Sequence, residues 1–158
     1  MSKTHASQLD RVQRYLQRFR EINSGRKHNH PSDYYEDDVY AFFQNCYHLK
    51  DWIKHDPQCK SWTNCEKLIT HSRNLSLCAD ICNGLKHFKL TKLRSSESPR
   101  IEGKDINLKI TEGGSEESGL KISMKIEIHT NSGPIDAFKL ATECVSEWKS
   151  YIESNTRN

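Results

Sequence analysis

Hydrophobic side chains recur every three or four positions over the first 90 residues, which is the period of an amphipathic helix. The spacing predicts helices over residues 6–23 and 33–55, a shorter helix that starts after Ser61, and a fourth from about residue 72 or 74 to residue 88. The apolar stripe of the first of these is formed by Leu9, Val12, Leu16, Phe19 and Ile22. Each of these helices is expected to bury one face and expose the other.

The period changes to two further along the chain. Apolar residues alternate with polar ones from residue 120 to 129, which predicts a half-buried strand, and a matching shorter strand is expected over 106–110. The acidic, glycine-rich stretch TEGGSEESG joins the two, so an antiparallel hairpin is expected. Residues 90–96 are a candidate third, edge strand, and a last helix is expected over 135–153 with Pro134 at its first position.

This order of elements predicts an α+β fold that is mostly α. We expect a four- to five-helix up-and-down bundle with a small antiparallel hairpin or sheet inserted before the last helix. The length of 158 residues fits a single domain over residues 1–158. Within it, residues 6–89 would form the helical bundle, 90–130 the β-hairpin insertion and 134–153 the closing helix.

Composition narrows the cellular setting. No apolar run approaches the roughly 18–20 residues that a spanning helix needs, and the N-terminus lacks the apolar core of a signal peptide. A cytoplasmic protein without a membrane partner is therefore expected, with its cysteines reduced. The cysteines are Cys46, Cys59, Cys65, Cys78, Cys82 and Cys144. Since no CxxC pair is present, small core residues are the favoured interpretation, with zinc ligands or disulfides as the alternatives.

The small net charge of +3 conceals an uneven distribution. The basic excess lies in the first two thirds of the chain, and the hairpin and last helix are acidic. One basic set, suited to phosphate groups, comprises Arg11, Arg14, Arg18, Arg26, Lys27, His28 and His30. The alternative for these residues is a solvated helix face followed by a basic loop.

Two polar stripes are candidates for chemistry. On the fourth helix, Asp80, Asn83 and His87 are spaced to form one stripe opposite the apolar face, with Lys86 beside it. A carboxylate, an amide and an imidazole in such a row can fix the tautomer of the histidine for acid–base work. The alternative is a solvated face. Gly84 in the same helix costs about 1 kcal/mol relative to alanine, which suggests close approach of another backbone or of a partner, with a glycine of no structural role as the alternative.

The second stripe lies on the second helix and holds His48, Asp51 and His55. If it faced the same cleft as the stripe on the fourth helix, the two would form one shared site. The histidines are seven residues apart rather than the four of HExxH, so no metal is expected, and no cofactor either. Trp52, Trp62 and Trp148 are expected to anchor the core or an interface.

Three stretches of the sequence resemble a known group of proteins. Residues 42–52 (FFQNCYHLKDW), 78–88 (CADICNGLKHF) and 141–148 (ATECVSEW) resemble small bacterial and mobile-element proteins. The helical part, residues 6–89 and 135–153, is also similar to HEPN domains. That resemblance implies an all-helical bundle that dimerises, and a metal-independent ribonuclease of bacterial toxin–antitoxin and anti-phage systems.

The sequence departs from the HEPN pattern at one position. Active HEPN ribonucleases carry an arginine separated from a histidine by four to six intervening residues, whereas the residues at those places before His87 are Cys82, Ile81 and Asp80. Asn83 matches the polar residue that follows the arginine, and Lys86 would be a poor substitute for the missing guanidinium. The departure favours binding over cleavage.

Two classes of function follow from the sequence. The first is a HEPN-like module that binds or cleaves RNA in a bacterial defence or toxin–antitoxin setting, whose catalytic residues would be His87, Asn83, Lys86 and Asp80. Its binding residues would be His48, Asp51, Arg11, Arg14, Arg18 and Lys27. The alternative is a non-catalytic interaction module that forms a homodimer or joins a defence complex. A sensor that binds a nucleotide in the same cleft is a third, weaker interpretation.

Overall fold

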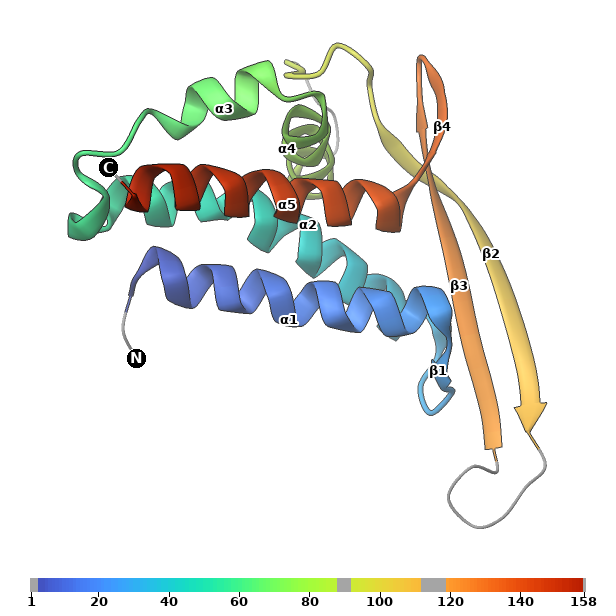
Figure 1. The fold of residues 1–158 in the computed structure, drawn as a ribbon. Helices are drawn as coiled ribbons and strands as arrows, with labels where there is room; N and C mark the ends of the chain where they lie inside the picture. Colours follow the sequence, from blue (N-terminus) through green and yellow to red (C-terminus); the bar gives the residue numbers. More distant parts are fainter. Residues whose placement is uncertain (1–2, 88–91, 112–118, 158) are drawn as a thin grey trace.

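The computed structural model describes residues 3–87, 92–111 and 119–157. This part of the chain is mostly helical with an antiparallel sheet, as the periodicity predicts (Figure 1). The helices are α1 (His5–Ser24), α2 (Ser32–His55), α3 (Cys65–His71), α4 (Arg73–Lys86) and α5 (Ala137–Thr156), with a 3-10 turn at Pro57–Cys59. The strands are β1 (Arg26–Lys27), β2 (Arg100–Thr111), β3 (Gly119–Thr130) and β4 (Gly133–Asp136).

The apolar stripes of the helices meet in one hydrophobic cluster within the described residues. α1 buries the stripe expected from the sequence except for Leu9, which is half-buried, and Val12 and Phe19 are fully inaccessible to solvent. Trp148 of α5 is also fully buried. Burial of one such side chain contributes about 1.5–3 kcal/mol, so the stripes, rather than local helix propensity, hold the helices together.

The sheet is organised around β3. β2 pairs with it antiparallel along nearly its whole length, from Arg100 opposite His129 to Thr111 opposite Gly119. The other edge of β3 is paired twice, by β1 near Ile122 and by β4 near Ile128. β3 therefore has a strand on both sides.

The alternation along β3 decides how the sheet meets the helices. Ile122, Met124, Ile126 and Ile128 are all buried, and the residues between them are exposed or half-buried. Their face packs against α1 and α5. In Figure 1 the long β2–β3 hairpin accordingly lies at one end of the helices and runs past α1.

Several local expectations are wrong. Residues 92–96 form no strand, and residues 90 and 91 lie outside the described residues; the additional strands are β1 and β4 instead. Pro134 belongs to β4, and α5 begins at Ala137 because the Asp136 side chain caps it, accepting a hydrogen bond from the Lys139 backbone N–H at 2.7 Å. α4 ends at Lys86 rather than at residue 88.

The six cysteines are all buried with free thiols, so the predicted burial of these residues is confirmed. Among the described residues, no helix combines the length and the apolar character that crossing a membrane would require.

Candidate nucleic-acid interface

Asp80 does not lie on an exposed stripe of α4 but is fully buried. One of its carboxylate oxygens accepts a hydrogen bond from the Arg94 backbone N–H at 2.7 Å. The other accepts from the Ser95 backbone N–H at 2.8 Å and from the Ser95 hydroxyl at 2.5 Å. The carboxylate thus fastens the segment before β2 to α4, and the sequence-based expectation of a solvated Asp80 is corrected.

The other candidates on α4 lie at its C-terminal end. Lys86 is the last helical residue and is exposed, while Asn83 is half-buried. His87 caps the helix, its backbone N–H donating to the Asn83 carbonyl at 3.0 Å, and it too is exposed. Within the described residues, nothing hydrogen-bonds the His87 imidazole, so the carboxylate–amide–imidazole row predicted from the sequence is not assembled around it.

The segment fastened by Asp80 carries Arg94 to a cluster of charges on α2 and α3. Glu66, in the first turn of α3, accepts hydrogen bonds from Lys50 Nζ at 3.2 Å, Lys54 Nζ at 2.5 Å and Arg94 Nη1 at 2.9 Å. Two of these cations also lie over the ring of Tyr47. The ring centroid is 4.5 Å from Lys50 Nζ and 5.7 Å from Arg94 Cζ. Three cations surround one carboxylate, which leaves an excess of positive charge.

The electrostatics of this cluster keep Glu66 ionised. Burial opposes ionisation, but the hydrogen bonds from Lys54, Lys50 and Arg94 outweigh it and lower the pKa of Glu66 to about 2. Burial also acts against the charge on Lys50, yet its contacts with Tyr47 and Glu66 raise the pKa of that ammonium above its usual value. At neutral pH the cluster is therefore fully charged.

His48 brings the two predicted stripes close to each other. Its Nε2 lies 3.9 Å from the sulfur of Cys82 on α4, so the α2 stripe does approach α4. Burial raises the pKa of Cys82 to about 11, and the positive charges of Lys86 and Lys50 partly oppose that shift. The Cys82 thiol is consequently protonated near neutrality and is no nucleophile.

A hollow of about 370 Å³ lies next to this cluster on the same half of α2. It is lined by Lys3, Asp51, Trp52 and His55. The Cζ atom of Arg11, one of the predicted basic residues, lies 5.5 Å from the centroid of the Trp52 ring. His55 Nδ1 lies 2.7 Å from the Asp51 carbonyl oxygen, which can only accept, so Nδ1 carries the proton of that hydrogen bond.

These two patches are joined through Asp51, whose carboxylate lies 3.9 Å from Lys50 Nζ. We call them together the basic face: the C-terminal half of α2 from Tyr47 to His55, with Lys3, Arg11, Glu66, Lys86 and Arg94 around it. Six Lys and Arg residues on this face stand against two carboxylates. Such an array of cations with aromatic rings suits a polyanion whose phosphates and bases both need partners.

The remaining predicted basic residues lie apart from the basic face. Arg18 forms an ion pair with Asp38 at 3.1 Å, in the acidic N-terminal half of α2, and covers the ring of Tyr15. Arg14 and Lys27 are exposed, the latter on β1. Of the basic residues proposed from the sequence, Arg11 alone is placed against the C-terminal half of α2.

Sequence reasoning missed Lys50, Lys54 and Arg94. The spacing of Lys50 and Lys54, one helical turn apart, was a signal that could have been weighed. Arg94 gave no such signal, because only the hydrogen bonds from its segment to Asp80 bring it to α2.

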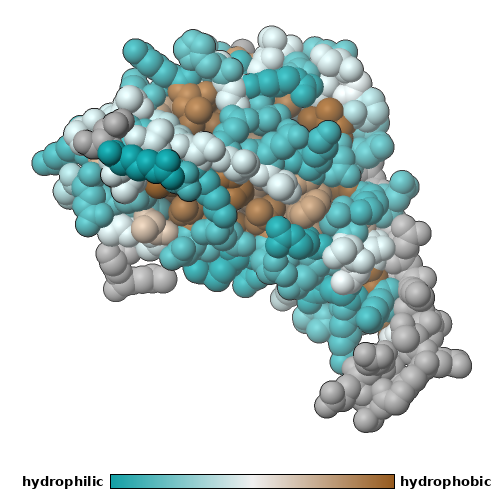
Figure 2. Space-filling view, viewed as in Figure 1, coloured by the Kyte–Doolittle hydropathy of each residue, from teal (hydrophilic) through white to brown (hydrophobic). Residues whose placement is uncertain are grey.

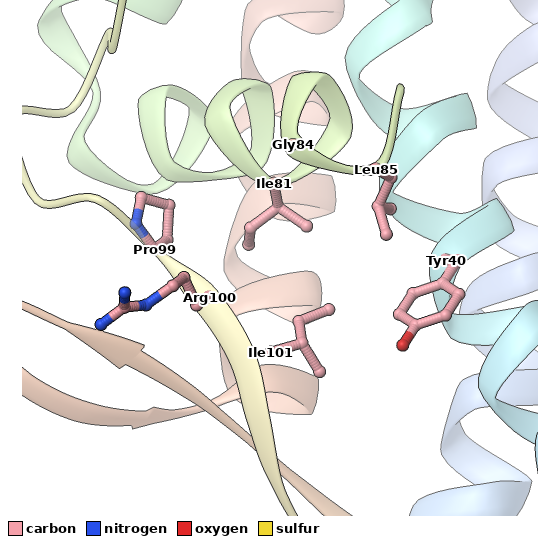
Figure 3. Close-up of a pocket in the computed structure, with 7 residues that line it drawn as sticks. All are labelled: Tyr40, Ile81, Gly84, Leu85, Pro99, Arg100 and Ile101. Carbon is pink, nitrogen blue, oxygen red and sulfur yellow. The ribbon is translucent and has the colours of Figure 1, made fainter. Parts of the chain in front are cut away.

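A second, apolar hollow of about 200 Å³ lies where α4 meets the start of β2. Figure 3 shows the side chains of Ile81 and Ile101 facing each other across it, with Leu85 and Tyr40 at the same end. Gly84 lines it as well, together with Pro99 and Arg100. Leu85 is 38% exposed here.

Comparison with known proteins adds no relative: no protein-family model, no curated protein and no solved structure matches the chain. A function must therefore be inferred from the geometry of the molecule.

Proposed function

We propose that this protein is a HEPN-like helical-bundle module that binds single-stranded RNA on the basic face. The observation that carries the proposal is the pairing of cations with aromatic rings on one half of α2: Lys50 and Arg94 against Tyr47, and Arg11 against Trp52. Cations of this kind neutralise phosphates, and guanidinium planes stack on unpaired bases. The bacterial defence or toxin–antitoxin setting is the one that the HEPN resemblance implies.

Binding is favoured over cleavage for two reasons. The guanidinium of the HEPN motif is missing from the sequence before His87. In addition, Asp80 is occupied by the backbone of Arg94 and Ser95 and cannot orient an imidazole. His87, Asn83 and Lys86 would then contact RNA at the edge of the basic face instead of cleaving it.

The proposal is tested by fluorescence anisotropy with a labelled, unstructured RNA. Lys54→Gln should weaken binding about three- to tenfold and reduce the slope of log affinity against log salt by about 0.7, the value for one phosphate contact on a single strand. Lys149→Gln, which removes an exposed lysine from α5, is the matched control and should change neither quantity. Equal affinity of the two variants would refute the basic face as the RNA site.

The same samples test cleavage. The wild type and His87→Ala are incubated with the RNA without metal, and the RNA length is measured on a denaturing gel. We expect intact RNA in both. Fragments that appear with the wild type and disappear with His87→Ala would instead assign a metal-independent ribonuclease.

A second candidate, a dimerisation or protein-interaction module, is favoured by one surface feature. Figure 2 shows a band of hydrophobic residues between hydrophilic ones on the face where α1 and α5 lie. Both helices carry half-buried apolar side chains at the margin of the core, namely Leu9, Tyr15, Phe138 and Ile152. A molar mass of one chain at about 50 µM, measured by light scattering, would exclude a homodimer through this band, whereas twice that mass would support it.

A further inference from the structure

Three cysteines from three different helices meet in the centre of the molecule. Cys46 of α2, Cys78 of α4 and Cys144 of α5 are each no more than 1% exposed, and their sulfur atoms all lie within 4.8 Å of one another. They are far apart in the sequence, so the tertiary structure alone assembles the set. The cluster is separate from the basic face.

A buried polar group without a partner accompanies the cluster. Trp148 is fully buried, and its indole Nε1 has no hydrogen-bond partner among the described residues.

The sulfur atoms lie near the separation that a bound metal ion requires. An ion about 2.3 Å from each of three sulfurs in a plane requires sulfurs about 4 Å apart, and the three sulfurs here all lie within 4.8 Å of one another. The other two thiols now contact backbone carbonyls, Cys78 that of Phe43 at 3.6 Å and Cys144 that of Asn74 at 3.4 Å. A bound metal ion would displace the protons of these thiols, and its positive charge would partly neutralise the three thiolates.

From this arrangement we infer that Cys46, Cys78 and Cys144 form a buried three-thiolate site for a thiophilic d10 metal ion, Cu(I) or Zn(II), with the Trp148 N–H as donor to the Cys46 ligand. Soft sulfur ligands select these ions, and a donor to the ligand sulfur is the usual support of such a site. Three sulfurs, with no histidine or carboxylate of the described residues in the cluster, favour Cu(I), which accepts three-fold coordination. The ion would fasten α2, α4 and α5 together.

The second group of potential ligands in the described residues, His5, Asp56 and Cys59, carries no such inference. Its members already satisfy one another: Asp56 accepts from the His5 backbone N–H at 2.8 Å and from His5 Nδ1 at 2.7 Å, and Cys59 contacts that same nitrogen at 3.2 Å. Burial and the charge of Asp56 raise the pKa of Cys59 to about 11, so its thiol stays protonated. This group fastens the N-terminal end of α1 to the end of α2.

The test is whether the protein retains a metal ion after refolding. The ion is added to the unfolded chain because the folded protein buries the three sulfurs. The full chain is refolded without oxygen, separately with Cu(I) and with Zn(II), dialysed against a weak chelator, and its metal content is measured. We expect one ion per chain for the wild type and for Cys65→Ala, a buried cysteine outside the cluster. Cys46→Ala and Cys144→Ala should retain less than a tenth of that amount, and the arm that retains metal identifies the ion.

Two measurements on the wild type keep the inference open to refutation if those variants fail to fold. X-ray absorption of the loaded protein should show three sulfur neighbours at about 2.3 Å, and loading should raise the unfolding midpoint. Nitrogen or oxygen neighbours in place of the sulfurs, or no retained ion of either kind, would overturn the inference. Equal retention by Cys144→Ala would overturn it as well.

Discussion

Two carboxylates hold Arg94, and they do so in different ways. Asp80 is fully buried and accepts hydrogen bonds from backbone N–H groups and a hydroxyl, with no cationic side chain of the described residues bonded to it. Glu66 is about a quarter exposed at its side chain and is bound by three cationic side chains. Asp80 therefore fixes the backbone of the segment before β2, and Glu66 fixes the guanidinium of Arg94.

The difference indicates what each carboxylate contributes. A buried acceptor that loses its partners costs the full desolvation of those groups, so Asp80 should matter for stability. An ion pair at the surface contributes little to stability but sets the local charge, so Glu66 should matter for what the basic face binds. Substitutions of Asp80, Arg94 and Glu66 can separate these roles, and the largest effect is expected at Asp80.

Replacement of Asp80 by asparagine should destabilise the protein by about 3 kcal/mol. The amide NH2 group would face the N–H of Ser95, so a buried donor would lose its acceptor. Urea unfolding monitored by circular dichroism measures the change. Glu153→Gln, at an exposed carboxylate of α5, is the control and should stay within about 0.5 kcal/mol of the wild type. An equal decrease in the free energy of unfolding for the two variants would show that the hydrogen bonds of Asp80 do not stabilise the fold.

Replacement of Arg94 by glutamine should act mainly on binding. The guanidinium is partly exposed and lies against Tyr47 and Glu66, so its removal takes one cation from the basic face and leaves the hydrogen bonds of its backbone to Asp80 in place. We expect RNA affinity to fall about fivefold, which corresponds to about 1 kcal/mol, and the urea midpoint to move little. A large loss of stability with unchanged affinity would contradict the assignment.

Replacement of Glu66 by glutamine should strengthen RNA binding about threefold. The substitution keeps the shape of the side chain and removes the negative charge that Lys50, Lys54 and Arg94 now share. Anisotropy at two salt concentrations measures it, with Glu153→Gln again as the control. Weaker binding would mean that Glu66 orients the three cations rather than competing with phosphate for them.

The smallest effect concerns pH. The folded-state pKa of Glu66 is lowered to about 2 from an ordinary value of 4.5, so its contribution to stability is complete above about pH 4.5 and is lost as the pH falls toward 2. The free energy of unfolding of the wild type should exceed that of Glu66→Gln by up to about 1 kcal/mol at pH 6, after allowance for solvent screening. The gap should close near pH 2. A gap independent of pH would exclude the charge of Glu66 as its cause.

The periodicity predicted the helices well because burial of a stripe is what stabilises them. α1 was expected over 6–23 and extends over His5–Ser24, and its predicted stripe is buried apart from Leu9, which packs half-buried at the margin of the core. The strand at 120–129 was equally plain, since alternation follows directly from the geometry of a half-buried strand. β1 and β4 were missed because strands of two and four residues are too short to show any period.

The candidate site was harder to predict because a helical wheel assumes one buried face. α4 has two: its apolar stripe packs into the core, and the segment before β2 covers Asp80 on another face. Leu85 shows the converse, an apolar residue left partly exposed beside the hollow where β2 begins. No pattern in residues 72–88 shows which other segment will lie on them.

By itself, the sequence determined the type and approximate extent of the longer elements and the burial of the cysteines, because those depend on periodicities and side-chain chemistry within one segment. The tertiary structure alone decided which residues act together. It brought Arg94 to Lys50 and Lys54, placed Arg11 over Trp52, and gathered Cys46, Cys78 and Cys144 around one point. Each of these groups joins separate segments of the chain, and the packing of apolar stripes, rather than any local signal, sets which segments become neighbours.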